Sequence, residues 1–450
     1  MISRVRSYLL GGGFGAGLVR AVAGSAILNL LGMALTFLVG IQLARGLGVE
    51  GYGIYGMAMA VVAILGVPSQ FGIPQLVVRE VAAHAARKDR AAIYGMLAWS
   101  WRTLRCTSLA VFSAFLVWVI AFGFEGSLGQ GMTLMLASLL IPLVAAVSLQ
   151  SAALRGLLHI VKSQIPDALV RPLVTSLLLG GLSIFVVPLN PALAIGVGIA
   201  SVCVAIIIGW ALLFRHAPRR NFPVNAWHSS KGLMRASFAM ALGEGLRVVP
   251  VHATVIVLGA IASFSDAGQF RVATSIAALL AFPLSIFNMV AAPAMSRLIV
   301  TGEIEKLQRL LCYSSAGMFI SVLLLSLPFL LMGGYLLEFL FGVGFGEASG
   351  MLGILALGTL ATAMLGVGGT LLSMAGRQGR VTVITGISVA VLCLFLWPLV
   401  KFQGGIGAAW AVTVSMCVSS GLFWHDAKRI VGVDSSVFSC VPAMRKMGKQ

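Results

Sequence analysis

The fold is decided by a stretch near the N-terminus, residues 27–89, which reads ILNLLGMALTFLVGIQLARGLGVEGYGIYGMAMAVVAILGVPSQFGIPQLVVREVAAHAARKD. Two long apolar runs, 22–44 and 52–75, are separated by a glycine-rich turn that carries Arg45 and Glu50. A helix needs about 20 apolar residues to cross a bilayer. Because the runs are continuous and do not alternate at every second residue, they favour membrane-spanning helices over the strands of a barrel.

The rest of the chain has the same character. Of its 450 residues, 59% are hydrophobic and only 10% are charged, whereas a soluble domain carries about 25% charged residues. This composition excludes a soluble enzyme, an exported globular domain and a disordered protein. The expected fold class is an all-α integral membrane protein with about 12 transmembrane helices. The apolar runs place them at 22–44, 52–75, 106–124, 131–153, 169–188, 191–214, 236–261, 268–292, 312–333, 350–372, 381–400 and 404–424.

Basic residues give the expected orientation. The net charge is +18, which in a soluble chain would suggest a nucleic-acid partner. In a membrane protein, Lys and Arg instead gather at the cytoplasmic ends of the helices. With the N-terminus inside, all basic residues fall on inside segments except Arg45, Arg247, Arg271 and Lys401. We therefore expect a multi-pass protein of the inner (plasma) membrane, with both termini cytoplasmic and no nucleic-acid partner.

A basic linker divides the chain near its middle. We expect a cytoplasmic lead-in (1–21), a six-helix lobe (22–214), the linker (215–235), a second six-helix lobe (236–424) and a basic cytoplasmic tail (425–450). A weak internal repeat supports this division, since three residue pairs match at an offset of 215 positions: Gly53 with Gly268, Tyr55 with Phe270, and Pro68 with Pro283. Both halves start on the same side, which predicts two pseudo-symmetric lobes related by an axis along the membrane normal.

Ionisable residues inside the spans are few, and each is a functional candidate because burying it costs at least about 2.5 kcal/mol. The seventh span contains Glu244, Arg247, Pro250 and His252. Glu244 and Arg247 share a helix face. They either neutralise each other, or Arg247 offers its planar fork to an anion in a central cavity while Glu244 orients it. We expect His252 to be a hydrogen-bonded packing residue rather than a proton carrier.

Four further residues complete the candidate substrate-binding set. Arg45 and Arg271 are either interface anchors or, with Arg247, a cationic lining for a phosphate. Asn29 and Asn288 are neutral, and such residues more often join helices than bind substrate. The full set is Arg247, Glu244, Arg45, Arg271, Asn29, His252 and Asn288.

The residues that are missing also matter. The first six expected spans contain no Asp or Glu in their apolar interiors, so the buried charge is basic on balance. This favours an anionic cargo over a cation. The sequence shows no P-loop, no HExxH or Ser/His/Asp arrangement, and no cysteine near a histidine. We therefore expect no catalytic activity, no cofactor and no metal site.

Residues 27–89 resemble the opening of the polysaccharide flippases, within the multidrug/oligosaccharidyl-lipid/polysaccharide exporter superfamily. The similarity lies in LARGLGVEGYGIY (43–55), followed by an apolar helix and by Phe71-Gly72 with Arg79. The resemblance implies two six-helix lobes around a central cavity. It also implies alternating-access transfer of a polyprenyl-pyrophosphate-linked oligosaccharide to the outer leaflet, for O-antigen, capsule or exopolysaccharide assembly. The implied partners are the lipid-linked glycan, membrane lipid, and possible polymerase and chain-length regulator proteins of the same pathway.

Two alternatives share this fold. A cation-coupled multidrug exporter is disfavoured by the missing acids, and a peptidoglycan lipid-precursor flippase often has helices beyond the twelve found here. A membrane-embedded glycosyltransferase or polymerase is a different class, and the short outside loops count against it.

Overall fold

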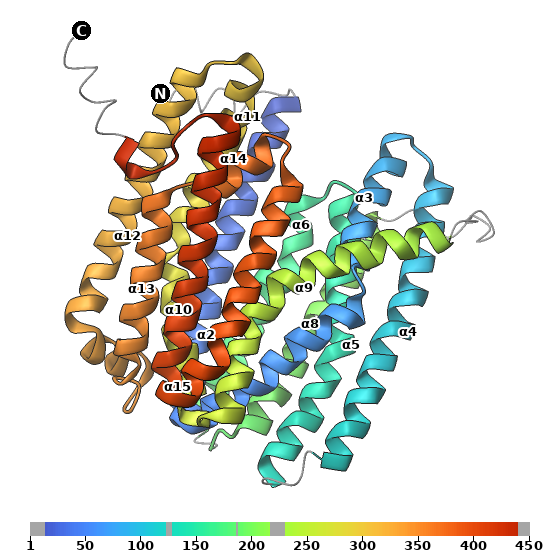
Figure 1. Ribbon diagram of the computed structural model, residues 1–450. Helices are drawn as coiled ribbons and strands as arrows, with labels where there is room; N and C mark the ends of the chain where they lie inside the picture. The colour runs from blue at the N-terminus through green and yellow to red at the C-terminus, as the bar shows by residue number, and fades with distance from the viewer. Residues whose placement is uncertain (1–13, 123–127, 186–187, 217–229, 440–450) are drawn as a thin grey trace. The chain divides into compact units, whose positions relative to one another are not determined.

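The computed structural model describes residues 14–122, 128–185, 188–216 and 230–439, and within these ranges every regular element is a helix (Figure 1). The all-α membrane fold expected from the sequence is therefore confirmed. The helices are α2 (Phe14–Gln70), α3 (Ile73–Ala86), α4 (Arg90–Phe122), α5 (Leu128–Gly156), α6 (Ile160–Gln164), the π-helix η1 (Ile165–Val170), α7 (Arg171–Ile184), α8 (Pro191–His216), α9 (Ser230–Ile261), α10 (Phe264–Leu280), α11 (Phe282–Thr301), α12 (Ile304–Phe341), α13 (Ala348–Leu365), α14 (Gly368–Met374), α15 (Gln378–Val431) and the short 3₁₀-helix η3 (Val437–Ser439).

Ten helical runs among the described residues are long and apolar enough to cross a membrane. Two of them, Gly24–Gln70 and Gln378–Val431, are 47 and 54 residues long, about twice what one span needs. Each is broken near its middle by a glycine with positive φ: Gly48 (φ 68°) in α2 and Gly404 (φ 54°) in α15. Glycine tolerates this conformation, which other residues avoid. With these two runs counted as two spans each, the helices match the twelve expected spans one by one.

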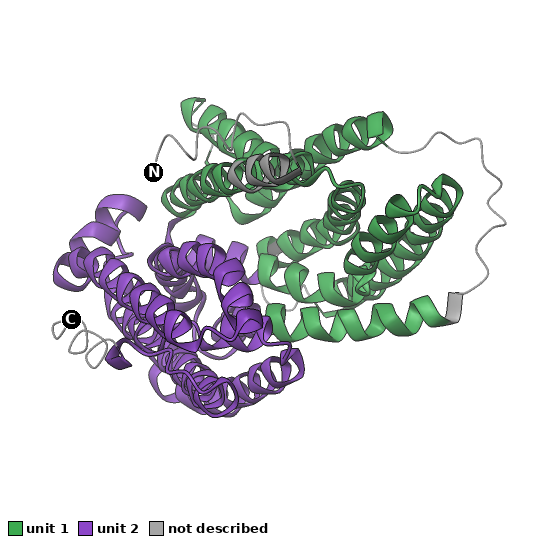
Figure 2. Ribbon diagram, turned by 90° about the horizontal axis from the view of Figure 1, so that it is seen from above, with its two compact units in different colours: residues 1–47, 58–249 green, residues 48–57, 250–450 purple. Residues whose placement is uncertain are grey.

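The chain forms two compact units (Figure 2). Among the described residues, unit 1 contains those up to Leu47 together with 58–249, and unit 2 contains 48–57 and 250–439. This division differs from the one drawn from the sequence, because 48–57 belongs to unit 2 and 236–249 to unit 1. The chain passes between units three times: at Gly48, where α2 is broken, between Met57 and Ala58 within α2, and at Pro250 inside α9. Proline removes a backbone donor and loosens a helix there. The expected linker and lead-in lie largely outside the described residues.

Unit 1 has a core in which α5 packs against α3, α4 and α8. Between α2 and α3 the chain turns at Phe71 and Gly72, which both have positive φ (48° and 69°). A Cβ on Gly72 would lie 2.3 Å from the carbonyl oxygen of Ser237, so α9 approaches this turn directly. The Ser237 hydroxyl also donates to the Phe71 carbonyl oxygen at 2.6 Å. The glycine turn thereby fixes the first half of α9 beside α3.

Unit 2 is built on α12, α13 and α15, with α10, α11 and α14 packed against them. The 48–57 segment of α2 crosses α10 at two glycines that the repeat pairs, Gly53 and Gly268. A Cβ on Gly53 would lie 1.8 Å from the Phe264 carbonyl oxygen, and one on Gly268 would lie 2.2 Å from that of Val49. Only residues without a side chain permit so close a crossing.

Candidate functional site

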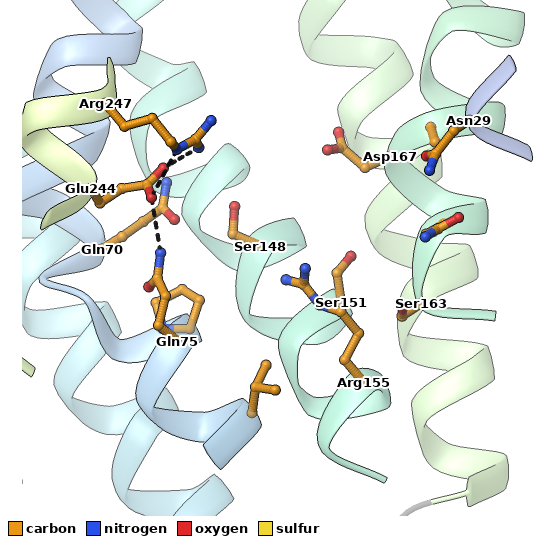
Figure 3. A pocket seen from close by; sticks show the side chains of 14 residues that line it. Asn29, Gln70, Gln75, Ser148, Ser151, Arg155, Ser163, Asp167, Glu244 and Arg247 are labelled. Atoms are coloured by element: carbon orange, nitrogen blue, oxygen red, sulfur yellow. Dashed lines mark hydrogen bonds and ion pairs between the residues drawn. The ribbon is translucent and has the colours of Figure 1, made fainter. Parts of the chain in front are cut away.

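Unit 1 contains a polar pocket of about 670 Å³ (Figure 3). Its walls come from α2, α3, α5, α6, η1 and α9. Four charged residues line it, two arginines and two acids, and most of the other lining residues carry an amide or a hydroxyl. The lining is Asn29, Gln70, Pro74, Gln75, Val78, Ser148, Ser151, Arg155, Ser163, Gln164, Asp167, Ala168, Glu244 and Arg247.

One wall of the pocket carries an ion pair on α9. Arg247 Nη2 lies 2.5 Å from Glu244 Oε1, and Arg247 Nε donates to Glu244 Oε2 at 3.3 Å. Gln75 on α3 donates to the same Oε2 at 3.4 Å. The Arg247 side chain is still 74% exposed, so guanidinium donors remain open to the pocket. The carboxylate therefore holds Arg247 in place without burying it.

A second wall is a polar face of α5. Ser148, Ser151 and Arg155 are spaced three and then four residues apart, which places them on one helix face. Figure 3 shows Arg155 and Ser151 side by side at the edge of the pocket. Ser151 is 9% exposed and its Oγ has no hydrogen-bond partner. Among the residues that the structure describes, the Arg155 guanidinium has no hydrogen bond or ion pair. Arg155 is exposed, so its donors are open to a ligand, and the buried hydroxyl of Ser151 without a partner favours a polar one.

The third wall includes the π-helix η1, which contains Pro166 and Asp167. π-Helical turns are rare and are often found at functional sites. Asp167 accepts from Arg171 Nη1 at 3.3 Å. The wall lies close to α2, because a Cβ on Gly32 would be 2.4 Å from the Ala168 carbonyl oxygen. Beside it, the buried Oε1 of Gln164 has no partner.

Asp167 corrects one inference from the sequence. The apolar interiors of the first six spans were expected to contain no acid, with the fifth span at 169–188, but the helical run that forms the fifth begins at Ile160 and includes Asp167. The expectation was wrong because the apolar run was started after this charge, whereas helical structure continues through it. Each pocket acid does have an arginine partner: Arg171 for Asp167, and Arg247 for Glu244.

The structure brings three of the candidate residues together, since Arg247, Glu244 and Asn29 all line the pocket. Arg45 also belongs to unit 1, but it is exposed and does not line the pocket. The other three candidates, Arg271, His252 and Asn288, belong to unit 2.

In unit 2, two of these candidates make contacts that join helices. The Arg271 guanidinium lies over the rings of Tyr52 and Tyr55, at 5.4 and 5.3 Å from their centres, and donates to the Gly56 carbonyl oxygen at 3.3 Å. Asn288 Oδ1 accepts from the Thr370 hydroxyl at 2.6 Å. His252 is half-buried.

Sequence reasoning missed Arg155, which it grouped with the inside anchors. The signal that could have found it is the polar face itself, because Ser148, Ser151 and Arg155 recur at helical spacing in an otherwise apolar span. Polar residues on one face of a membrane helix point toward protein or water rather than lipid.

Comparison with known proteins places this geometry in context. A family described as "Polysaccharide biosynthesis protein" matches residues 18–299. A Shigella flexneri protein assigned as an O-antigen transporter is 41% identical over 64 residues, which is 13% of this chain and 15% of that one. The chain thus spans only a small part of this relative's length.

Solved structures superpose on most of the chain, although their sequence identity to it is low. An inward-facing multidrug resistance MATE family transporter of the MOP superfamily superposes with a TM-score of 0.74 at 14% identity, covering 90% of this chain and 98% of that one. The lipid II flippase MurJ in an inward closed conformation gives 0.69 at 11% identity, covering 90% and 87%. At such low identities the likeness shows the fold, with its two lobes of membrane helices.

Proposed function

The chain belongs to the polysaccharide biosynthesis protein family, and from this premise we propose that it is a flippase for a polyprenyl-pyrophosphate-linked oligosaccharide. It transfers this lipid from the cytoplasmic to the outer leaflet of the inner membrane by alternating access, with both termini in the cytoplasm. The transferred glycan serves the assembly of a surface polysaccharide. The protein moves its cargo without changing a covalent bond.

The observation that carries the proposal is the unit 1 pocket, where Arg155 and Arg247 stand on separate walls among amides and hydroxyls. A glycan on a pyrophosphate cannot enter hydrocarbon unaided, because an ion loses tens of kcal/mol of hydration there. Guanidinium groups replace that hydration for phosphate oxygens. Amides, hydroxyls and carboxylates offer hydrogen bonds to sugar hydroxyls.

The cation-coupled exporter is the main rival, and Asp167 and Glu244 give it two pocket acids. A coupling carboxylate must gain and lose a charge in turn. Both acids are already paired with an arginine of the protein, so neither is an unpartnered carboxylate awaiting a cation, which supports the anionic cargo.

The experiment is deletion of the gene, followed by quantification of lipid-linked glycan in each leaflet. We expect the glycan lipid to accumulate on the cytoplasmic side and drug tolerance to stay unchanged. Complementation with the wild-type gene should restore export. Loss of drug tolerance without trapped glycan would identify an exporter instead, and a trapped peptidoglycan precursor would identify the other flippase.

A further inference from the structure

The two arginines of the pocket are in different states. Arg247 is bound by Glu244 through two contacts, and Glu244 is bound in turn by Gln75. Arg155 has no such partner among the described residues; only the charge of Asp167 acts on it through space. An arriving anion therefore meets one guanidinium that is open and one whose Nε–Nη2 edge is already occupied.

We infer that Arg155, with the hydroxyls of Ser148 and Ser151, is the primary phosphate contact of unit 1, and that Glu244 holds the Nε–Nη2 edge of Arg247 in a latch that an anion must open to bind that edge. This inference rests on the proposed function and assigns separate roles within its site. A guanidinium beside two hydroxyls on one helix face matches the oxygens of a phosphate.

The latch follows from competition for one guanidinium. Glu244 occupies Arg247 as a phosphate would, since both are anions with two oxygens available to the fork. Anion binding to the Nε–Nη2 edge of Arg247 must displace this carboxylate, whereas binding at Arg155 displaces no protein group. Glu244 therefore weakens anion binding in the empty pocket and keeps Arg247 oriented toward it.

The four charges of the pocket also limit the cargo. Two arginines and two acids sum to no net charge, so the pocket does not select for negative charge alone. The acids and amides accept hydrogen bonds, which the many hydroxyls of a sugar supply and a fully ionised phosphate group does not. The cargo class that uses both sets of groups is a phosphate joined to a hydroxyl-rich sugar.

The test measures binding to the purified full-length protein in lipid nanodiscs by calorimetry. The probe is farnesyl pyrophosphate, and farnesol is the uncharged control. Arg155→Ala should weaken probe binding by about tenfold or more, the loss of one charge-assisted contact. Arg155→Lys should recover part of the affinity. Arg105→Ala removes an equal charge from α4, outside the pocket lining, and should leave binding unchanged.

The latch is tested by Glu244→Gln, which keeps the shape and removes the competing charge. We expect binding about threefold tighter or more, and a larger loss from Arg247→Ala in this background than in the wild type. The binding of inorganic pyrophosphate should depend on Arg155 in the same way but with lower affinity. Comparing it with farnesyl pyrophosphate separates the phosphate contact from the contribution of the lipid chain.

Three results would overturn the inference: equal binding of farnesol and the probe, unchanged binding in Arg155→Ala, or weaker binding in Glu244→Gln. These binding results do not depend on the cellular deletion. If deletion traps no glycan while Arg155 still governs probe binding, the proposed function fails and the phosphate contact stands.

Discussion

Unit 1 and unit 2 differ in how far their polar residues are paired within the protein. In unit 2, Arg271 lies over two tyrosine rings, Asn288 bonds Thr370, and Arg380 pairs with Asp426 at 2.8 Å. In unit 1, the Ser151 hydroxyl and the Gln164 Oε1 have no partner, and Arg155 stands open beside them.

This difference teaches which polar residues mark a binding surface. Residue type does not decide it, because Arg155 and Arg271 are both arginines in apolar helices. A binding surface is marked instead by polar groups that lie beside a pocket without a hydrogen-bond partner, because such groups cost free energy until a ligand or water satisfies them. The comparison predicts that unit 2 arginines contribute to stability and the open arginine of unit 1 to binding.

The largest effect on stability should come from Gly72→Ala, which disrupts the contact between α9 and the turn before α3 that supports the unit 1 pocket. The new Cβ would lie 2.3 Å from Ser237 O and 2.6 Å from Ala241 N, at a φ of 69° that disfavours a side chain. We expect a loss of about 3 kcal/mol or more, seen as a much lower apparent melting temperature in detergent. Gly243→Ala is the matched control, because Gly243 lies on α9, the helix that Gly72 approaches, and its Cβ meets open space. Equal stability of the two variants would refute this account of the α3–α9 contact.

The next effect compares the two arginines directly. Arg271→Ala should lower stability by about 2 kcal/mol, since it removes two cation–π contacts and a hydrogen bond. Arg155→Ala should change stability by no more than about 0.5 kcal/mol, because no contact is lost. Thermal unfolding of both variants, with probe binding measured in parallel, checks this. If Arg155→Ala destabilised the protein, that arginine would have a structural role, and the difference between Arg155 and Arg271 would no longer hold.

The sequence predicts the spans well and the pocket only in part. Apolar runs locate helices because burial in lipid depends on the hydropathy summed over a whole segment. Arg247 and Glu244 could be found because a charge inside a clear apolar run is conspicuous. Asp167 could not, because the π-helix around Pro166 continues the helix past a charge that interrupts the apolar run in the sequence. The sequence also does not predict that 48–57 belongs to unit 2 and 236–249 to unit 1. This assignment depends on the backbone at Gly48 and on how the helices pack.

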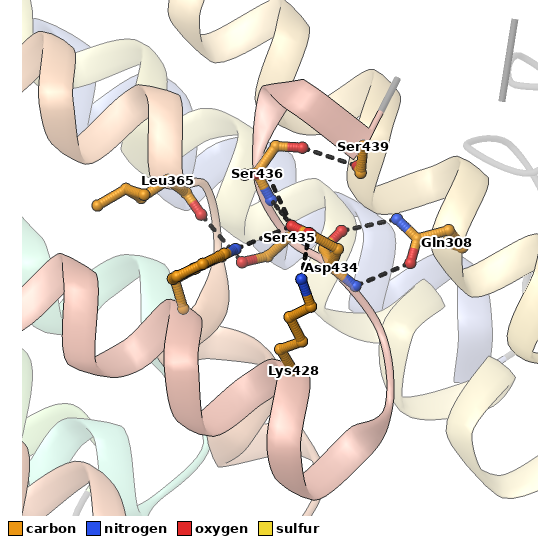
Figure 4. Close-up of polar contacts among 8 residues, drawn as sticks. Gln308, Leu365, Lys428, Asp434, Ser435, Ser436 and Ser439 are labelled. Atoms are coloured by element: carbon orange, nitrogen blue, oxygen red, sulfur yellow. Dashed lines mark hydrogen bonds and ion pairs between the residues drawn. The ribbon is translucent and has the colours of Figure 1, made fainter. Parts of the chain in front are cut away.

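The smallest effect concerns the segment that follows α15 in unit 2 (Figure 4). The Asp434 carboxylate accepts from Trp424 Nε1, from the backbone N–H and hydroxyl of Ser436, and from Lys428 Nζ. Gln308 on α12 pairs with its backbone through two hydrogen bonds, of 2.6 and 2.8 Å. Next to it, the fully buried Ser435 donates to the Leu365 carbonyl oxygen. The segment thus ties the ends of α12, α13 and α15 together.

Partial burial would raise the pKa of Asp434, but hydrogen bonds from Ser436, Trp424 and Lys428 outweigh it and hold this pKa below the ordinary value. Because the folded-state pKa is depressed, the stabilisation is present above the unfolded pKa of about 3.9 and is lost as pH falls through the folded value. Asp434→Asn should therefore melt below the wild type at neutral pH, and the gap should close only below about pH 4. Melting curves from pH 7 to 3 measure this gap. Ser436→Ala removes one donor and should give a smaller gap in the same window, whereas a gap of unchanged size from pH 7 to 3 would mean that the charge of Asp434 is not its source.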